Sequence, residues 1–110
     1  MKLPFHEHAF VPAAKLADYL LSPTHPVGKS KARFFAAFGF DAANMTDLEQ
    51  QLIRIAQTED VYTAMRSSYG EKYVVQGILQ GVDGRQALIE TVWIIEPGEQ
   101  RPRFVTAYPA

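Results

Sequence analysis

The spacing of apolar residues changes once along this chain of 110 residues, close to residue 60. Before residue 60, apolar residues recur at intervals of three and four, which is the period of one face of an α-helix. After it, apolar and polar residues alternate, which is the period of a half-buried β-strand. Helices followed by a run of strands predict an α+β fold, in which the helices cover one face of an antiparallel sheet.

Three helices are expected in the first half of the chain. The first starts at Val11-Pro12, because proline is tolerated in the first turn of a helix, and it ends at Ser22-Pro23, because the residue before a proline leaves the helical region. The second spans residues 30–38. The third starts at Thr46, which with Glu49 has the pattern of a capping box. Its buried stripe is expected to comprise Leu48, Leu52, Ile55 and Ala56.

The second half predicts strands joined by tight turns. Residues 72–79, 86–95 and 103–108 have strand character, and residues 60–66 are a further candidate. Asp83-Gly84 lies between two of these segments and suits a hairpin turn, since this pair accepts positive φ angles.

We therefore expect one domain over residues 1–110, with three N-terminal helices within about 11–58 packed on a C-terminal antiparallel meander of three to four strands within about 60–109. The residues expected to be buried are Leu16, Leu20, Phe34, Phe38, Leu52, Val75 and Trp93.

Composition limits the classes of function. The chain has no cysteine, which excludes disulfides and thiolate zinc sites and favours a cytoplasmic location. No run of residues has the length and apolar character of a membrane span or a leader. His6 and His8 lack a clear third ligand, so no metal is expected, and no cofactor-binding motif is present. The net charge of −1 gives no general attraction to polyanions, so any nucleic acid must bind locally.

One stretch is locally basic. Residues 25–35, "HPVGKSKARFF", contain His25, Lys29, Lys31 and Arg33 and no acidic residue. A glycine before a helix start, with cations around it, is typical of an anion site. The alternatives are a solvated helix edge, because lysine is mostly exposed, and an ion pair between Arg33 and a strand carboxylate such as Glu90.

Several segments resemble the bacterial family called domain of unknown function 6883. They are "HAFVPAAKLADYLLSPTHPVGKSKARFFAAFGF", "YVVQGILQGVDGRQALIETVWII" and "PRFVTAYP", which together cover nearly the whole chain. The chain also resembles, more distantly, the barnase–colicin–RelE-like ribonuclease toxins, which place helices before an antiparallel sheet and often end on a strand like "VTAYP". This second resemblance implies metal-independent cleavage of RNA, in which the substrate's own 2′-OH attacks the phosphate.

Such chemistry needs proton transfer and cations that offset the charge of the transition state. His25 is the candidate acid–base catalyst, because its ordinary pKa lies near neutrality. Lys31 and Arg33 are candidate electrostatic stabilisers, and Thr106 is a candidate catalytic hydroxyl on the last strand. Lys29 and Tyr108 are candidates for substrate binding, the tyrosine because its ring can stack on a base.

The expected partners are RNA and a cognate antitoxin or immunity protein. The opposing interpretation is a non-enzymatic interaction module, which is itself an immunity or antitoxin-like partner or binds an acidic protein through its cationic loop.

Overall fold

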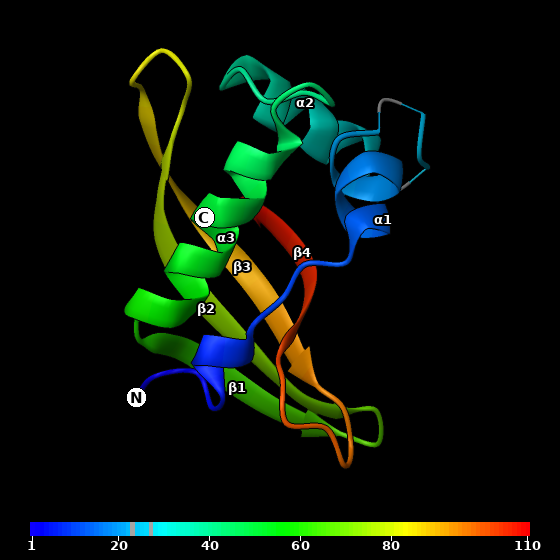
Figure 1. Cartoon of the computed structure of the whole chain (residues 1–110), viewed down its shortest axis with the longest axis vertical. Coiled ribbons are helices and arrows are strands. Elements are labelled where there is room, and N and C mark those ends of the chain that lie inside the picture. The colour runs from blue at the N-terminus through cyan, green and yellow to red at the C-terminus, as the bar shows by residue number, and fades with distance from the viewer. Residues whose placement is uncertain (23, 27) are drawn as a thin grey trace.

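The computed structural model describes residues 1–22, 24–26 and 28–110. It has the predicted α+β architecture, with the helices in front of one antiparallel sheet (Figure 1). The helical part contains the 3-10 helix η1 (His6–His8), α1 (Ala13–Lys15) running into the π-helix η2 (Leu16–Leu20), α2 (Lys29–Ala37) and α3 (Met45–Thr58). The strands are β1 (Val61–Ser67), β2 (Gly70–Gln80), β3 (Gln86–Ile95) and β4 (Arg103–Pro109).

The sheet is a simple meander with the strand order β1-β2-β3-β4, so every strand pairs with its neighbour in sequence. The candidate strand at residues 60–66 is confirmed as β1. The turn between β2 and β3 has Gly84 at a φ of 89°, which is the left-handed conformation expected of an Asp-Gly hairpin. β1 and β4 are the outer strands.

Helix α3 packs on the middle of the sheet through its predicted stripe, because Leu48, Leu52, Ile55 and Ala56 are all buried. The approach is closest over Gly77 of β2. A Cβ atom on Gly77 would lie 2.6 Å from Ile55 Cγ1, which is inside van der Waals contact. The absence of a side chain at residue 77 therefore sets how closely α3 approaches the sheet.

Trp93 fills the centre of the core and has no exposed surface. Its ring meets that of Phe104 edge to face, with centroids 5.4 Å apart. The indole Nε1–H donates to Thr91 Oγ1 at 2.8 Å, and the Thr91 hydroxyl in turn donates to the Val75 carbonyl at 2.7 Å. Both polar groups are thus satisfied inside the core, as buried polar groups must be.

Two local predictions for the helices are wrong. Phe34 and Phe38 are only partly buried, and Phe35 is fully buried instead, since the side of α2 that faces the core carries Ala32 and Phe35. Phe34 and Phe38 contact each other at the margin of the core, with their rings tilted by 49° and their centroids 5.1 Å apart.

The predicted capping box at Thr46 is not formed either, because α3 begins one residue earlier, at Met45. Asn44 stabilises the turn before the helix. Its Oδ1 accepts from the Asp41 N–H at 2.8 Å, and its Nδ2 donates to the Gly39 carbonyl at 2.8 Å. The side chain of Asn44 is committed to the preceding turn and does not cap α3. The other predicted core residues, namely Leu16, Leu20, Leu52, Val75 and Trp93, are buried as expected.

Candidate active site

A tyrosine that connects the helical layer to the last strand organises the candidate site. The Tyr19 hydroxyl and Thr106 Oγ1 are hydrogen-bonded at 2.9 Å, across 87 residues of sequence. The His25 ring meets the Tyr19 ring edge to face, with centroids 5.1 Å apart. Two ammonium groups approach the same ring, with Lys15 Nζ 5.0 Å and Lys31 Nζ 5.9 Å from its centroid. These five residues are called the Tyr19 cluster below.

Local helix geometry places Tyr19 in this position. The turn that carries it is π-helical, and the Leu21 N–H donates to the Leu16 carbonyl, five residues back, at 2.8 Å. Turns of π-helix are rare in proteins, and those that do occur are often at functional sites. Helix α2 begins directly against this turn, because a Cβ on Gly28 would lie 2.1 Å from the Tyr19 carbonyl oxygen. Only glycine permits this approach, which brings Lys31 over the Tyr19 ring.

The segment that holds His25 is ordered by side-chain hydrogen bonds. Ser22 Oγ accepts from the backbone N–H of His25 at 3.2 Å, and His25 Nδ1 accepts from the Gly28 N–H at 3.0 Å. Because Nδ1 is the acceptor, the neutral ring carries its proton on Nε2. In this tautomer Nε2 is a hydrogen-bond donor.

A row of polar side chains continues from Thr106 across three strands. Thr106 and Tyr108 lie on one face of β4, opposite to the fully buried Ala107. Tyr108 pairs with Glu90 of β3, which pairs with Gln76 of β2, and Gln76 Nε2 donates to Glu90 Oε2 at 2.9 Å. Burial raises the pKa of Tyr108, and the adjacent Glu90 carboxylate raises it further. We call Gln76, Glu90 and Tyr108 the Glu90 row.

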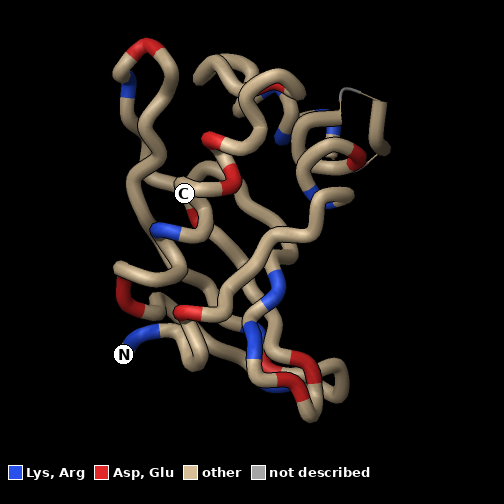
Figure 2. Tube along the Cα trace, viewed as in Figure 1, with Lys and Arg blue, Asp and Glu red and all other residues tan. Residues whose placement is uncertain are grey.

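The structure separates the predicted cations into two groups. Lys31 belongs to the Tyr19 cluster, whereas Lys29 and Arg33 line a hollow of about 390 Å³ on another side of α2, together with Leu21, Ala32, Ala36, Phe40, Asp41 and Ala42. In Figure 2 the basic positions of α1 and α2 lie in the upper right of the molecule. Glu90 hydrogen-bonds within its own row and is not paired with Arg33.

Of the six residues predicted from the sequence, the structure thus brings together His25, Lys31, Thr106 and Tyr108 on or beside the Tyr19 cluster. The division of the cations follows from the helix period, since residues 29 and 33 share a face of α2 and residue 31 lies about 200° away around the axis. Sequence reasoning missed both Lys15 and Tyr19 as site residues. No local pattern indicates that residue 19 meets residue 106.

The part of the chain that the structure describes has neither a candidate metal site nor a candidate membrane-spanning helix. Among residues 1–22, 24–26 and 28–110, no three His, Asp or Glu side chains gather in a way that could hold a metal ion. No helix in these same ranges has both the length and the apolar composition needed to cross a membrane.

The fold and the position of the cluster define a small α+β domain with a polar site between its helical layer and the last strand. The chain belongs to the family described as "Domain of unknown function (DUF6883)", whose model matches residues 2–110. No curated protein sequence matches it.

Among solved structures, a chain of the "Contact-dependent growth inhibition toxin - immunity protein complex from Klebsiella pneumoniae 342" superposes with a TM-score of 0.71. The sequence identity is 15%, and the match covers 96% of each chain. The two chains therefore share a fold.

Proposed function

We propose that this domain is a ribonuclease-like toxin that cleaves RNA without a metal ion, through attack of the substrate's 2′-OH on the adjacent phosphate. The observation that carries the proposal is the Tyr19 cluster, in which the Thr106 hydroxyl, an imidazole and two ammonium groups lie around the Tyr19 side chain. Hydroxyl, imidazole and ammonium groups are the donors that bind a phosphate and stabilise its transition state. A chain of a toxin–immunity complex shares this fold, which supports a toxin-related role and a cognate protein partner as parts of the proposal.

In the proposed reaction, the 2′-oxygen forms a bond to phosphorus and the bond from phosphorus to the 5′-oxygen breaks. The products are a 2′,3′-cyclic phosphate and a 5′-hydroxyl. Lys31 and Lys15 offset the charge that grows on the phosphate oxygens, and the Tyr19–Thr106 hydroxyl pair donates to one of them. Where His25 acts only as a hydrogen-bond donor, Glu90 accepts the 2′-OH proton and the Lys31 ammonium supplies a proton to the departing oxygen.

Two roles for His25 lead to different expectations. The hydrogen bond from the Gly28 N–H to Nδ1 favours His25 as a donor from Nε2 to a phosphate oxygen. The acid–base role predicted from the sequence requires the ring to gain and lose a proton, which breaks that bond. The variant His25→Gln distinguishes them, because a glutamine amide donates a hydrogen bond but transfers no proton near neutral pH. Substantial activity in this variant supports the donor role, and its complete loss supports acid–base catalysis.

The test of the proposal uses two cations of the same helix. Purified protein is incubated with total RNA in the presence of a chelator, and initial cleavage rates are compared for Lys31→Ala and Arg33→Ala. We expect Lys31→Ala to lower the rate by about 10²- to 10³-fold, the usual cost of losing one positioned transition-state donor. Arg33→Ala is the matched control, because Arg33 lines a different hollow.

Circular dichroism and thermal melts should show that both variants fold like the wild type. If the wild type cleaves no RNA, or if Lys31→Ala retains full activity, the proposal is wrong. If Arg33→Ala loses as much activity as Lys31→Ala, Lys31 and Arg33 act in one site, as the sequence predicted, and the assignment of Arg33 to a separate hollow is wrong as a functional division.

A second candidate function is a non-enzymatic partner of the immunity type. The observation that favours it is the net charge of −1, since ribonucleases that rely on phosphate contacts are usually basic. Inducible expression in a bacterial host separates the two. A toxin stops growth and its Lys31→Ala variant does not, whereas an immunity protein leaves growth unchanged.

A further inference from the structure

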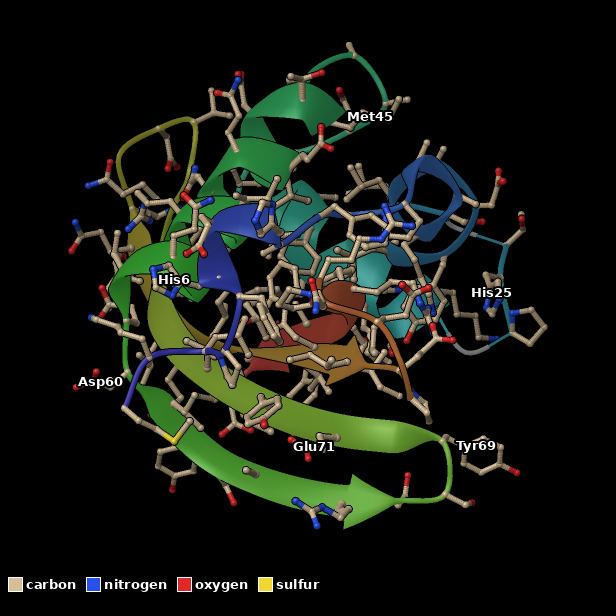
Figure 3. The ribbon with its side chains drawn as sticks, turned by 60° about the horizontal axis from the view of Figure 1, so that its bottom comes forward. His6, His25, Met45, Asp60, Tyr69 and Glu71 are labelled. Atoms are coloured by element: carbon tan, nitrogen blue, oxygen red, sulfur yellow. The ribbon has the colours of Figure 1, made fainter. Side chains whose placement is uncertain are left out.

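The Glu90 row crosses the face of the sheet that points away from α3, because side chains alternate along each strand. Gln76 is next to Gly77, over which Ile55 of α3 packs. Glu90 is next to Thr91, which is fully buried. Figure 3 shows the helices gathered on one side of the curved sheet. The row therefore lies on the side that the helices leave open, and its three side chains are half-buried.

The Glu90 carboxylate is held between the two strands that flank β3. From β2, Gln76 Nε2 donates to Glu90 Oε2 at 2.9 Å. From β4, Tyr108 is paired with Glu90 in the register of the sheet. Burial raises the pKa of Tyr108, and a hydrogen bond to Glu90 raises it further. A carboxylate has about four acceptor positions, so these two donors leave room for a hydrogen bond from a substrate.

One member of the row is suited to accept a proton at neutral pH. The amide of Gln76 does not titrate in this range. The raised pKa of Tyr108 keeps its phenol protonated, so the phenol acts as a donor. The carboxylate of Glu90 is then the base of the row.

Among the described residues, the rows on either side of the Glu90 row hold no ionisable side chain. They are Val74, Val92 and Thr106 on one side and Ile78 and Leu88 on the other. No cation in these rows takes the place of Gln76 in orienting the carboxylate. Two residues along a strand span about 7 Å, so Glu90 lies one step from Thr106 of the Tyr19 cluster. The carboxylate is therefore adjacent to the place proposed for the phosphate.

We propose that Gln76 is a positioning residue, which holds the Glu90 carboxylate in the orientation from which it removes the 2′-OH proton of RNA. The inference rests on the proposed function, in which this carboxylate accepts the proton. The O–H bond breaks, its electrons form the bond to phosphorus, and its proton passes to the carboxylate. The hydrogen bond from the amide fixes the plane of the carboxylate, whose terminal torsion is otherwise only weakly restrained.

The pH dependence of cleavage tests this role. A rate that needs an ionised carboxylate falls as the pH drops through the titration of that carboxylate. Gln76→Glu puts a second carboxylate within hydrogen-bonding distance of Glu90, and such a pair shares one proton up to a raised pH. The acid limb of the pH–rate profile should therefore move up by about one to two pH units.

The matched control is Gln86→Glu, which makes the same change of charge at an exposed residue of β3. Residue 86 is four positions from Glu90 along the strand, about 13 Å away, where salt screens most of its charge. The acid limb of this variant should stay where it is in the wild type.

Two further variants show whether Gln76 acts through Glu90. Gln76→Met keeps the length of the side chain and removes the donor, and it should lower the rate at neutral pH by about 10- to 100-fold. Glu90→Gln removes the proton acceptor, and in that background Gln76→Met should lower the residual rate no further. Circular dichroism should show that all these variants fold, since both side chains point away from the core.

Carboxyl carbon NMR signals give a measurement that needs no activity. In Gln76→Glu, a glutamate carboxyl should take up its proton at a higher pH than in the wild type or in Gln86→Glu. If this titration shifts and the rate profile does not, the inference is overturned, because the base is then another group such as His25.

The remaining outcomes separate this inference from the proposed function. A wild type that cleaves no RNA refutes the proposed function, and the role of Gln76 with it. A wild type that cleaves RNA, together with a Gln76→Met variant of equal activity, overturns the inference alone. An acid limb that is the same in Gln76→Glu and Gln86→Glu also overturns it alone.

Discussion

The hydrogen bonds around Trp93 depend on one hydroxyl, and Thr91→Val removes it with little change in shape. The variant leaves the buried indole N–H without an acceptor, since Thr91 Oγ1 is its partner at 2.8 Å. An unpaired buried donor costs about 1–3 kcal/mol, and the lost hydrogen bond to the Val75 carbonyl costs about 1 kcal/mol more. We expect the free energy of unfolding to fall by about 2–4 kcal/mol, a large share of the roughly 5–15 kcal/mol of a typical domain.

Urea denaturation followed by far-ultraviolet circular dichroism measures this loss, since the chain has a single tryptophan and its signal is absent from one of the backgrounds compared. The midpoint should fall by about 1–2 M with an unchanged m-value, because the exposed surface on unfolding stays the same. Thr91→Ser is the control, since it keeps the hydroxyl and removes only a methyl group, at a cost of about 1 kcal/mol. In a Trp93→Phe background, which has no indole N–H, Thr91→Val should cost clearly less than in the wild type. Equal costs in the two backgrounds would refute the reasoning.

Two further predictions concern close packing and alkaline pH. Gly77→Ala should destabilise the fold by about 1–3 kcal/mol through overpacking, because its Cβ would lie 2.6 Å from Ile55 Cγ1. Thermal melts should show part of this loss recovered in the double variant with Ile55→Val, and no recovery would contradict the contact. Burial, followed by the hydrogen bond to Glu71, raises the pKa of Tyr73 to about 12. The folded state thus holds this proton more tightly than the unfolded state, whose tyrosine titrates near its ordinary pKa of about 10. The stability that Tyr73 contributes is complete below about pH 10 and is lost as the pH rises toward 12. Urea midpoints measured across this range should fall less steeply for Tyr73→Phe than for the wild type, and the exposed control Tyr69→Phe should behave like the wild type.

The architecture could be predicted because it depends on the spacing at which apolar residues repeat along the chain. The buried stripe of α3 repeats at the helical period, and the buried residues of β2 and β3 follow the period of a strand. Each pattern arises because one face of the element packs on the core. The errors occur where several apolar residues compete for one face. In "ARFFAAF" the spacing of Phe34 and Phe38 suits a helix stripe as well as that of Ala32 and Phe35 does, and only packing against η2 and β4 decides between them.

The candidate site was only partly predictable for a different reason. His25 and Lys31 stand out as a local cluster of charge, and Thr106 and Tyr108 as the end of a strand. The residue that joins them, Tyr19, has the spacing of an ordinary core residue. Its role depends on a hydrogen bond to β4 that no spacing within the first helix encodes.

The bond between Tyr19 and Thr106 also has a consequence for folding during synthesis. One partner lies in the first helix and the other in the last strand, so the chain emerging from the ribosome holds half of the site until β4 is made. Contacts between such distant residues form late, because loop closure must precede them. A domain built in this way gains its polar site only in the final step of folding. A toxin assembled in this order would stay inactive toward the cell's RNA for as long as its own chain is incomplete.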